Sequence, residues 1–371
     1  MAIDNKDKKV LNVPHLRFPE FQEEWKKCKL GDLCNVLMCK RILASQTNTE
    51  DGVPFYKIGT IGSTPDAYIS KELFDDYKVK YSYPHKGEVM ITCAGTVGKC
   101  VVYDGEDAYF QDSNIVWIDN PTQNISNGFL FHLLSKVDWR KLNSTTIIRI
   151  YNDDLRNLKM SYPRKEEQQK ISHLLSLLDE RITTQNKIIE DLKLLKSAIV
   201  DKLTTPQKEW KSTKIGNVLS IGSGRDYKHL EDGNIPVYGT GGYMLSVDSY
   251  LYDGESVCIG RKGTINKPIF LKGKFWTVDT LFYTHTFRSI TPRFCYYLFT
   301  TIDWLKYNEA SGVPSLSKVT IENISISIPD LVTQKQLCAV LDSMTDKLDI
   351  EQKLLDAYHA QKQYLLQQIF I

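Results

Sequence analysis

Two long stretches of the chain repeat apolar residues at alternating steps of three and four positions. With the pattern started at Ile171, eight of the ten a and d positions up to Leu203 are apolar, and the same holds 166 residues later, from Leu337 to Ile369. A pattern sustained over five heptads predicts paired coiled-coil helices rather than ordinary surface helices. The residues expected to pair the helices are Ile171, Leu175, Leu178, Ile182, Ile189, Leu192, Leu337, Leu341, Met344, Leu348, Leu355 and Leu365.

Each helix is expected to begin just after a proline, Pro163 or Pro329, because proline fits the first turn of a helix. Neither apolar stripe can stay in water, so we predict that the two helices pair with each other, antiparallel. The polar a and d positions fall at matched places in the two copies: Gln185, Lys196, Glu351 and Lys362. They could form a buried layer that fixes the register, for example through a Lys196–Glu351 pair, or extend to the edge of the seam.

The rest of the chain is also duplicated. The segment 25–34 matches 210–219, and 131–143 matches 296–308 without a gap. Between them, the sequence GTVGK at 95–99 matches GTINK at 263–267. The protein is therefore a tandem repeat of one module followed by one helix.

The two modules are rich in glycine, aromatic and β-branched residues. The sequences GEVMITCAG, GESVCIGRKG, VPFYKIGT and IPVYGTGG predict short strands that end in glycine turns, and the segments around Trp139 and Trp304 have helical apolar spacing. We expect an α+β fold of two mixed α/β modules and an antiparallel helix pair. The expected segments are an N-terminal arm (1–21), module 1 (22–162), helix 1 (163–204), module 2 (205–328) and helix 2 (329–371).

Antiparallel helices would separate the modules along a rod. Some 38 helical residues at ~1.5 Å each make this rod at most ~57 Å long. That length corresponds to at most ~17 base pairs of B-DNA at ~3.4 Å each.

Composition limits the class of protein. The chain has 47 basic and 45 acidic residues among 371, a net charge of +2. No apolar run approaches the ~18 residues of a membrane helix, and the polar start lacks a signal peptide, so we expect a cytoplasmic protein. The eight cysteines form no CxxC pair, which favours reduced thiols that pack as small hydrophobic side chains.

No catalytic motif stands out. The sequence GTVGK lacks the first glycine of a phosphate-binding loop, and Cys100 stands where that loop needs serine or threonine. No methyltransferase tetrapeptide is present, and the seven histidines stand singly, without metal-ligand spacing. We therefore expect no active site and no metal in this chain.

DNA readout needs cations for phosphates and polar side chains that reach base edges. Both modules carry such residues near turns, beside tyrosines, while many acidic residues lie on the helices and offset the total charge. Any one of these residues could also be an ordinary surface group. The candidates are Lys40, Arg41, Lys57, Lys99, Arg149, Tyr151, Asn152, Arg225, Tyr227, Lys228, Arg261, Lys262, Lys267 and Ser311.

Taken together, these features resemble the specificity subunit of type I restriction–modification systems. The resemblance is carried by VPHLRFPEF at 13–21, Trp25, Leu30-Gly31-Asp32, and the start of the first helix, with Pro163, Glu166-Glu167-Gln168, Ile171 and Leu178-Asp179. The second copy departs from this pattern, with Val332-Thr333-Gln334 and with Thr345 where Asp179 stands. The resemblance covers essentially the whole chain and rests on the architecture more than on any single motif.

The resemblance implies a non-catalytic subunit that binds double-stranded DNA. Each module would be a target recognition domain that reads one half of a bipartite, gapped site. The helices would set the gap and dock two DNA methyltransferase subunits, and restriction–translocase subunits would complete the complex. S-adenosylmethionine, ATP and Mg²⁺ would bind only to those partners. The alternatives are a coiled-coil scaffold that binds proteins without reading DNA, and an enzyme with an unrecognised site.

Overall fold

The computed structural model describes residues 11–141 and 149–371. The chain divides into two compact units. Unit 1 comprises the chain up to Thr184 together with Leu355–Ile371, and unit 2 comprises Gln185–Leu354. Each unit holds one module and a part of both long helices. The expected segment boundaries differ from this division, because the units cut across the helices.

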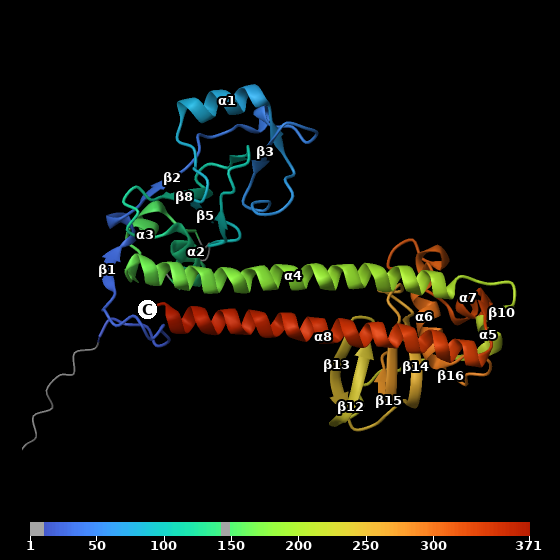
Figure 1. Ribbon diagram of the computed structural model, residues 1–371. Coiled ribbons are helices and arrows are strands. Elements are labelled where there is room, and N and C mark those ends of the chain that lie inside the picture. Colours follow the sequence, from blue (N-terminus) through green and yellow to red (C-terminus); the bar gives the residue numbers. More distant parts are fainter. Residues whose placement is uncertain (1–10, 142–148) are drawn as a thin grey trace, which may run out of the picture. The chain divides into compact units, whose positions relative to one another are not determined.

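The two long helices are α4, Lys165–Thr204, and α8, Leu331–Ile369 (Figure 1). Each begins two residues after its proline, as the sequence predicts. In unit 1, Ile171 and Leu175 of α4 pack in one core with Leu366 and Ile369 of α8. In unit 2, Val200 near the end of α4 packs with residues near the start of α8, Cys338 and Leu341. The helices are therefore antiparallel within each unit.

The polar a and d positions make different contacts from the pair suggested above. Gln185 donates from Nε2 to Oε2 of Glu351 (2.6 Å) and to the backbone oxygen of Glu351 (3.1 Å). Lys362 forms an ion pair with Asp179 instead. The charged groups that shift the pKa of Lys196 are Arg293, Asp349 and Asp342. The Lys196–Glu351 pair is therefore wrong: Gln185 and Glu351, which are equivalent positions of the two copies, meet each other.

The module of unit 1, outside residues 142–148, contains three small sheets. The strands are β1 (Lys26–Lys29), β2 (Asn35–Leu37), β3 (Val53–Tyr56), β4 (Tyr68–Ile69), β5 (Val89–Thr92), β6 (Cys100–Val102), β7 (Tyr109–Phe110), β8 (Ile115–Asp119) and β9 (Lys159–Tyr162). They form sheets of order β2-β8-β5-β6, β4-β3-β7 and β1-β9. The helices are α1 (Lys71–Lys80), α2 (Asn127–Lys136) and α3 (Asn152–Arg156), with 3-10 turns at Leu30–Asp32 and Ala44–Gln46.

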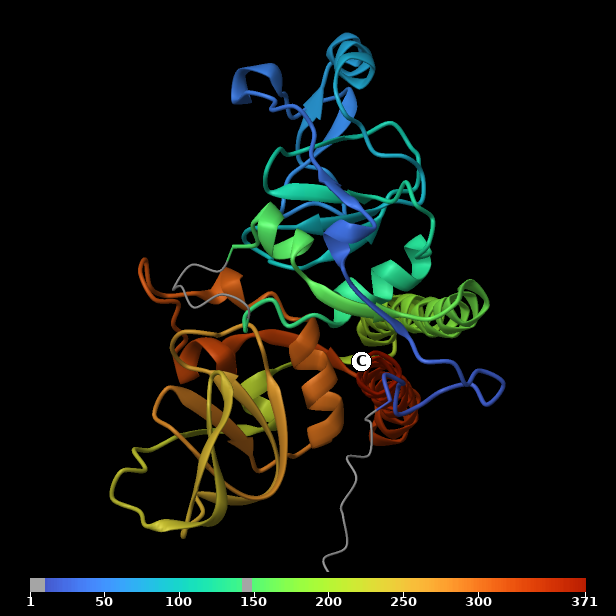
Figure 2. The same ribbon diagram turned by 90° about the vertical axis from the view of Figure 1, so that its left-hand side faces the viewer.

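The module of unit 2 has one larger sheet. The strands are β10 (Lys211–Lys214), β11 (Ser220–Ser223), β12 (Asp232–Gly239), β13 (Gly242–Val247), β14 (Tyr252–Gly260), β15 (Ile269–Thr277), β16 (Leu281–His285) and β17 (Ser325–Ile328). Six of them follow the order β11-β16-β14-β15-β12-β13, and β10 pairs with β17. Figure 2 shows strands of this module in yellow and orange. The helices are α5 (Ile215–Val218), α6 (Pro292–Thr301) and α7 (Lys318–Asn323), with a 3-10 turn at Trp304–Tyr307.

The duplication is visible in the strand pairing. Each module has one parallel strand pair at corresponding positions: Tyr56 of β3 pairs with Phe110 of β7 in unit 1, and Tyr238 of β12 pairs with Thr277 of β15 in unit 2. Unit 2 makes this contact with β15, which also pairs with β14. In unit 1 the corresponding stretch is divided into β6 and β7, so that the sheet is split. The four predicted glycine-ended strands are confirmed as parts of β5, β14, β3 and β12.

One helix of each module lies between its sheet and the long helices. Phe129 and Leu133 of α2 share a core with Val89 of β5 and Ile171 of α4, and α2 is seen against α4 in Figure 1. Phe294 and Leu298 of α6 share a core with Val257 of β14 and Leu341 of α8. Both module helices end before the tryptophan of their repeat, Trp139 or Trp304.

Residues 11–21, the described part of the expected N-terminal arm, are bound within unit 1; residues 1–10 lie outside the described residues. Arg17 donates to both carboxylate oxygens of the buried Glu167, at 2.7 and 2.8 Å, and the indole N–H of Trp25 donates to Glu167 as well (3.2 Å). The backbone N–H of Leu16 donates to the carbonyl of Gln368, near the end of α8 (3.0 Å). The arm therefore fastens the end of α8 beside the start of α4. All eight cysteines are free thiols, as predicted.

Candidate nucleic-acid interface

In unit 2, several loops meet beyond the sheet. The N–H of Arg225 donates to the carbonyl of Thr277 (2.8 Å), and the N–H of Arg261 donates to that of Thr280 (2.8 Å). The carbonyl of Arg261 accepts from the N–H of Leu316 (2.9 Å). We define loop cluster 2 as residues 224–228, 239–242, 261–267, 278–280 and 309–316. It brings together most of the candidate DNA-binding residues of the second module.

A polar cleft of about 590 Å³ lies in loop cluster 2. Arg261 and Lys262 line it from one loop and Lys318 from the start of α7, with the hydroxyl groups of Thr280 and Ser315. Arg261 and Lys262 are exposed, and Arg261 Nη1 lies 3.4 Å from the backbone oxygen of Asp279. Asp279 and Glu309 also line the cleft, so it carries both signs of charge. Its cations and hydroxyl groups can bind phosphate oxygens and base edges.

Unit 1 builds an equivalent surface with the same backbone bonds. The N–H of Cys93 donates to the carbonyl of Asn114 (2.7 Å), and the carbonyl of Cys93 accepts from the N–H of Ile150 (2.9 Å). These bonds repeat those of Arg261, which aligns with Cys93. We define loop cluster 1 as residues 38–41, 57–61, 94–99, 111–114 and 149–152. Sequence reasoning placed candidates in each module, and the structure shows that they converge.

The cations of loop cluster 1 have partners on the surface itself. Arg41 lies 3.9 Å from Asp112, and Lys57 lies 3.0 Å from Asp66. The amine of Lys99 donates to the backbone oxygen of Ile61. Because exposed pairs of this kind are weak, they can open in favour of a phosphate. The Lys40 carbonyl accepts from Tyr109 Oη (3.0 Å), and this bond holds the 38–41 segment in place.

One contact between two loops is present in both clusters, but the loop that carries the cation differs between them. In unit 2, the backbones of Lys262 and Ser315 pair in an isolated antiparallel β-bridge. The aligned residues of unit 1 are Ala94 and Arg149, so the cation has moved to the other loop. The Arg149 guanidinium lies 5.9 Å from the ring of Tyr151, which is 62% exposed beside Asn152 at the start of α3. The two surfaces therefore share a backbone and differ in the groups that they present.

Glycines allow the close packing of these loops. Gly98 has a φ of +84°, and an added Cβ would lie 2.1 Å from the ring of Trp139. At Gly224 an added Cβ would lie 1.9 Å from the carbonyl oxygen of Val278. A side chain at either position would displace the loop that bears Lys99 or Arg225.

Some candidates are placed differently from the rest. The ring of Tyr227 packs against a small core that includes Val237 and Trp276, so this side chain supports the loop from within. Lys228, Lys267 and Ser311 are exposed on loop cluster 2. Sequence reasoning did not single out Lys318, although it aligns with Asn152, which was a candidate. The repeat was the signal that could have found it.

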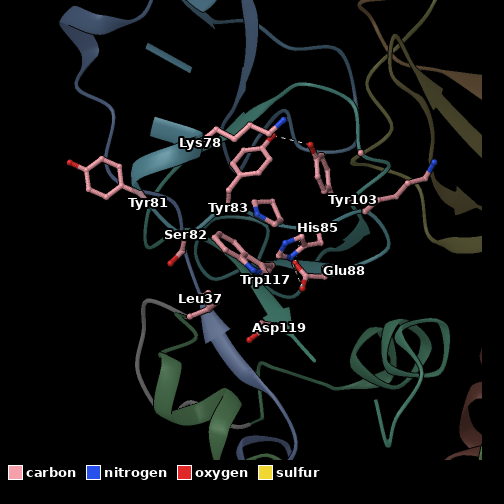
Figure 3. Close-up of a pocket in the computed structure, with 13 residues that line it drawn as sticks. Leu37, Lys78, Tyr81, Ser82, Tyr83, His85, Glu88, Tyr103, Trp117 and Asp119 are labelled. Carbon is pink, nitrogen blue, oxygen red and sulfur yellow. Dashed lines mark hydrogen bonds and ion pairs between the residues drawn. The ribbon is translucent and has the colours of Figure 1, made fainter. Parts of the chain in front are cut away.

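A second cleft, of about 630 Å³, lies at the other end of β5 and β8 in unit 1. Figure 3 shows Tyr83, Tyr103 and Trp117 around it, with His85 beside Glu88. The Tyr83 and Tyr103 hydroxyl groups are 2.9 Å apart, and burial is the main cause that raises the pKa of Tyr83. None of the candidate DNA-binding residues lines this cleft, which is bordered by the turn that follows α1.

The buried glutamines that begin the long helices were also missed as structural anchors. Gln168 Oε1 accepts from the N–H of Ser126 (2.6 Å), and its Nε2 donates to the carbonyls of Pro163 (2.9 Å) and Asn124 (3.0 Å). Gln334 repeats these contacts with Thr291 (2.7 Å), Pro329 (3.0 Å) and Ser289 (2.9 Å). Each amide ties a long helix to the loop before α2 or α6 and thereby holds the module.

A family model for the type I restriction modification DNA specificity domain matches the chain twice, over residues 22–194 and 207–357. The chain belongs to this family. It carries two such domains, which confirms the tandem duplication and the resemblance of the sequence to specificity subunits. Each match includes one of the two loop clusters.

Individual proteins agree with this membership. A type I restriction enzyme specificity subunit of Haemophilus influenzae is 47% identical over 186 residues, which are 50% of this chain and 46% of that protein. The MjaX specificity subunit of Methanocaldococcus jannaschii is 23% identical over 406 residues, 92% of each chain. The first of these matches spans only about half of the relative.

Solved structures show the same fold. The S subunit of the type I restriction–modification system of M. genitalium aligns with a TM-score of 0.64 and 18% identity, over 97% of this chain and 99% of that one. A chain from a type I restriction–modification system aligns with a TM-score of 0.58 and 15% identity, over 92% and 96%. The long helices and paired modules are therefore features of a known fold.

Within residues 11–141 and 149–371, no three or more His, Cys, Asp or Glu side chains are grouped so that they could hold a metal ion. In the same part of the chain, no helix combines the length and the apolar character needed to span a bilayer.

Proposed function

We propose that this chain is the DNA-recognition subunit of a type I restriction–modification complex, and that each specificity domain reads one half of a bipartite, gapped DNA site. The observation that carries the proposal is the repeated loop cluster. In both modules, equivalent loops are joined by equivalent backbone hydrogen bonds, which are made at Cys93 in unit 1 and at Arg261 in unit 2. A shared backbone with different side chains suits two domains that bind the same polymer at different sequences.

The proposal includes partners that do the chemistry. Two DNA methyltransferase subunits dock on the helices, and restriction–translocase subunits join them. S-adenosylmethionine, ATP and Mg²⁺ bind to those partners, and this chain does no catalysis of its own. Exposed apolar residues on the long helices, such as Leu195 (51% exposed) and Ile350 (63%), support a docking role for them.

Salt-dependent DNA binding tests the proposal. The chain, assembled with its methyltransferase subunits, is titrated with duplex DNA at several salt concentrations. Each lost phosphate contact reduces the slope of log affinity against log salt by ~1. We expect the variant Arg261→Ala/Lys262→Ala in loop cluster 2 to lower both the affinity and the slope, the slope by up to ~2.

A matched control comes from the same module. Lys211→Ala removes an exposed lysine from β10, outside loop cluster 2, and should leave the slope unchanged. The corresponding test in unit 1 compares Lys99→Ala with Lys26→Ala, since Lys26 aligns with Lys211. If the loop variants keep the slope of the unmodified chain, the loop clusters are not the DNA-binding surfaces.

A further inference from the structure

The two modules contact the long helices through different polar side chains. In unit 1, His132 of α2 is 1% exposed and faces α4. Its Nε2 lies 3.5 Å from Ser176 Oγ, and its Nδ1 lies 3.9 Å from the carboxylate of Asp179. Lys362 of α8 forms an ion pair with the same carboxylate. Gly128, one turn earlier on α2, brings the two helices close, because an added Cβ would lie 3.2 Å from the Cβ of Ser172.

In unit 2, a guanidinium group makes the corresponding contact between the module helix and the long helix. Arg293 of α6 donates from Nε to Asp342 Oδ1 of α8 (2.6 Å), and the hydroxyl of Tyr297 donates to the same oxygen (2.5 Å). The Arg293 guanidinium also lies 4.7 Å from the ring of Phe270. The side chains of Arg293 and Asp342 are 30% and 38% exposed, so that water screens the pair only in part.

Alignment of the repeats shows what has changed. Gly128 and His132 of the first module helix correspond to Arg293 and Tyr297 of the second. Ser176 and Asp179 of α4 correspond to Asp342 and Thr345 of α8. The carboxylate has therefore moved by one helical turn, and the module side chain that meets it has changed with it. The lysine on the opposite helix has not changed, since Lys362 corresponds to Lys196.

We propose that each module is matched to the first half of the helix that follows it, and that module and helix together are the unit that can be exchanged between chains. In unit 1 the matched set is Gly128, His132, Ser176 and Asp179. In unit 2 it is Arg293, Tyr297, Asp342 and Thr345. A module moved without its helix would meet the other module's set.

The cost of a mismatch follows from the charges. If the second module were seated on α4, Arg293 would face Ser176 in place of Asp342, near the ammonium of Lys362. A cation that loses its partner at a half-buried site is costly. If the first module were seated on α8, Asp342 would lose both the guanidinium and the tyrosine hydroxyl. In neither case can the exchanged module supply the missing charge.

The environment of Lys196 is consistent with this account. Burial and the neighbouring Arg293 lower the pKa of Lys196, whereas Asp349 and Asp342 raise it. In unit 1 the equivalent Lys362 is bound directly to Asp179. Because Thr345 replaces the aspartate in unit 2, Arg293 takes the available carboxylate, and Lys196 lies beside a like charge.

A cycle of paired substitutions tests the match in the intact chain. The module-face variant Arg293→Gly/Tyr297→His and the helix-face variant Asp342→Ser/Thr345→Asp each introduce half of the unit 1 set into unit 2. We expect either one to lower the hydrogen-exchange protection factors of α6 amides by about tenfold or more. The combined variant restores the match, with Lys196 placed to pair with residue 345, and it should lose at least about tenfold less than the product of the two single losses.

Two outcomes would overturn the proposal. If the losses of the two variants simply multiply in the combined variant, the two faces are independent. If the combined variant loses more protection than the product of the two single-face losses, the unit 1 set is not a working alternative in unit 2. Asp346→Ser, which removes an exposed aspartate from the same turn of α8, is the control and should not change the protection of α6. DNA binding does not enter the readout, so the result is independent of the proposed function.

Discussion

Single positions show how the two copies came to present different surfaces on one backbone. Cys93 is buried at the edge of loop cluster 1, next to Ala94, whereas the aligned Arg261 is exposed in loop cluster 2 with the same two backbone bonds. The cation at the neighbouring contact is Arg149 in one copy and Lys262 in the other. Substitutions at such positions change the groups available to a ligand without changing the bonds that hold the loop.

His132 gives a pH dependence that belongs to one residue. Burial lowers the pKa of its imidazole to about 4, from an ordinary value of 6.5. The folded state therefore resists protonation that the unfolded state accepts, and stability is lost as the pH falls from 6.5 to about 4, by up to ~3 kcal/mol. We expect His132→Gln to remove this part of the acid sensitivity of unit 1, measured by urea unfolding across this pH range.

The control for this prediction is another histidine of the same unit. His173→Gln removes an exposed imidazole from α4 and should keep the pH dependence of the unmodified chain. An equal pH dependence in the His132→Gln variant would show that the imidazole of His132 is protonated as readily in the folded protein as in the unfolded one.

At the level of elements, the long helices are held to the modules by buried amides as well as by apolar contacts. Gln168 and Gln334 are fully buried, and each contacts three backbone groups. These contacts fix where each helix starts relative to the module before it. The resemblance to specificity subunits had already included Gln168, and the structure supplies the physical reason.

Loss of either amide should be expensive. Gln334→Ala leaves the N–H of Thr291 and two carbonyl groups without a protein partner, and each unsatisfied group costs ~1–3 kcal/mol. We expect a loss of at least ~2 kcal/mol in the free energy of unfolding of unit 2, measured with urea. Gln336→Ala, an exposed glutamine two residues later on α8, should change it by less than ~0.5 kcal/mol. Similar losses in both variants would contradict the anchoring role.

The elements were largely predictable because their signals are local or repeated. Heptad spacing and the prolines located α4 and α8, and the aligned glycine turns located β5 and β14. The Lys196–Glu351 pair was wrong because the register of two helices depends on packing along their whole length. The roles of Gln168 and Gln334 could not be read from the sequence, since two of the three backbone groups that each contacts, an N–H and a carbonyl, lie in a loop about forty residues earlier.

At the level of the whole molecule, the net charge of +2 is an average over two kinds of surface. The loop clusters carry ten lysines and arginines against four acidic residues. On the long helices, exposed acids such as Glu180, Glu190 and Asp346 lie among a nearly equal number of basic residues. The candidate DNA-binding residues were found from the sequence as separate groups. That they converge depends on loop contacts between distant segments, which the structure supplies.

The most direct test of the central claim is the methylated motif in cells. Residues 205–371, the second module with its helix, are replaced by the corresponding segment of another family member, and methylated adenines are mapped by sequencing. The account predicts that one half of the gapped motif changes and the other half is kept. A change in both halves, or in neither, would contradict the claim that each specificity domain reads its own half of the site.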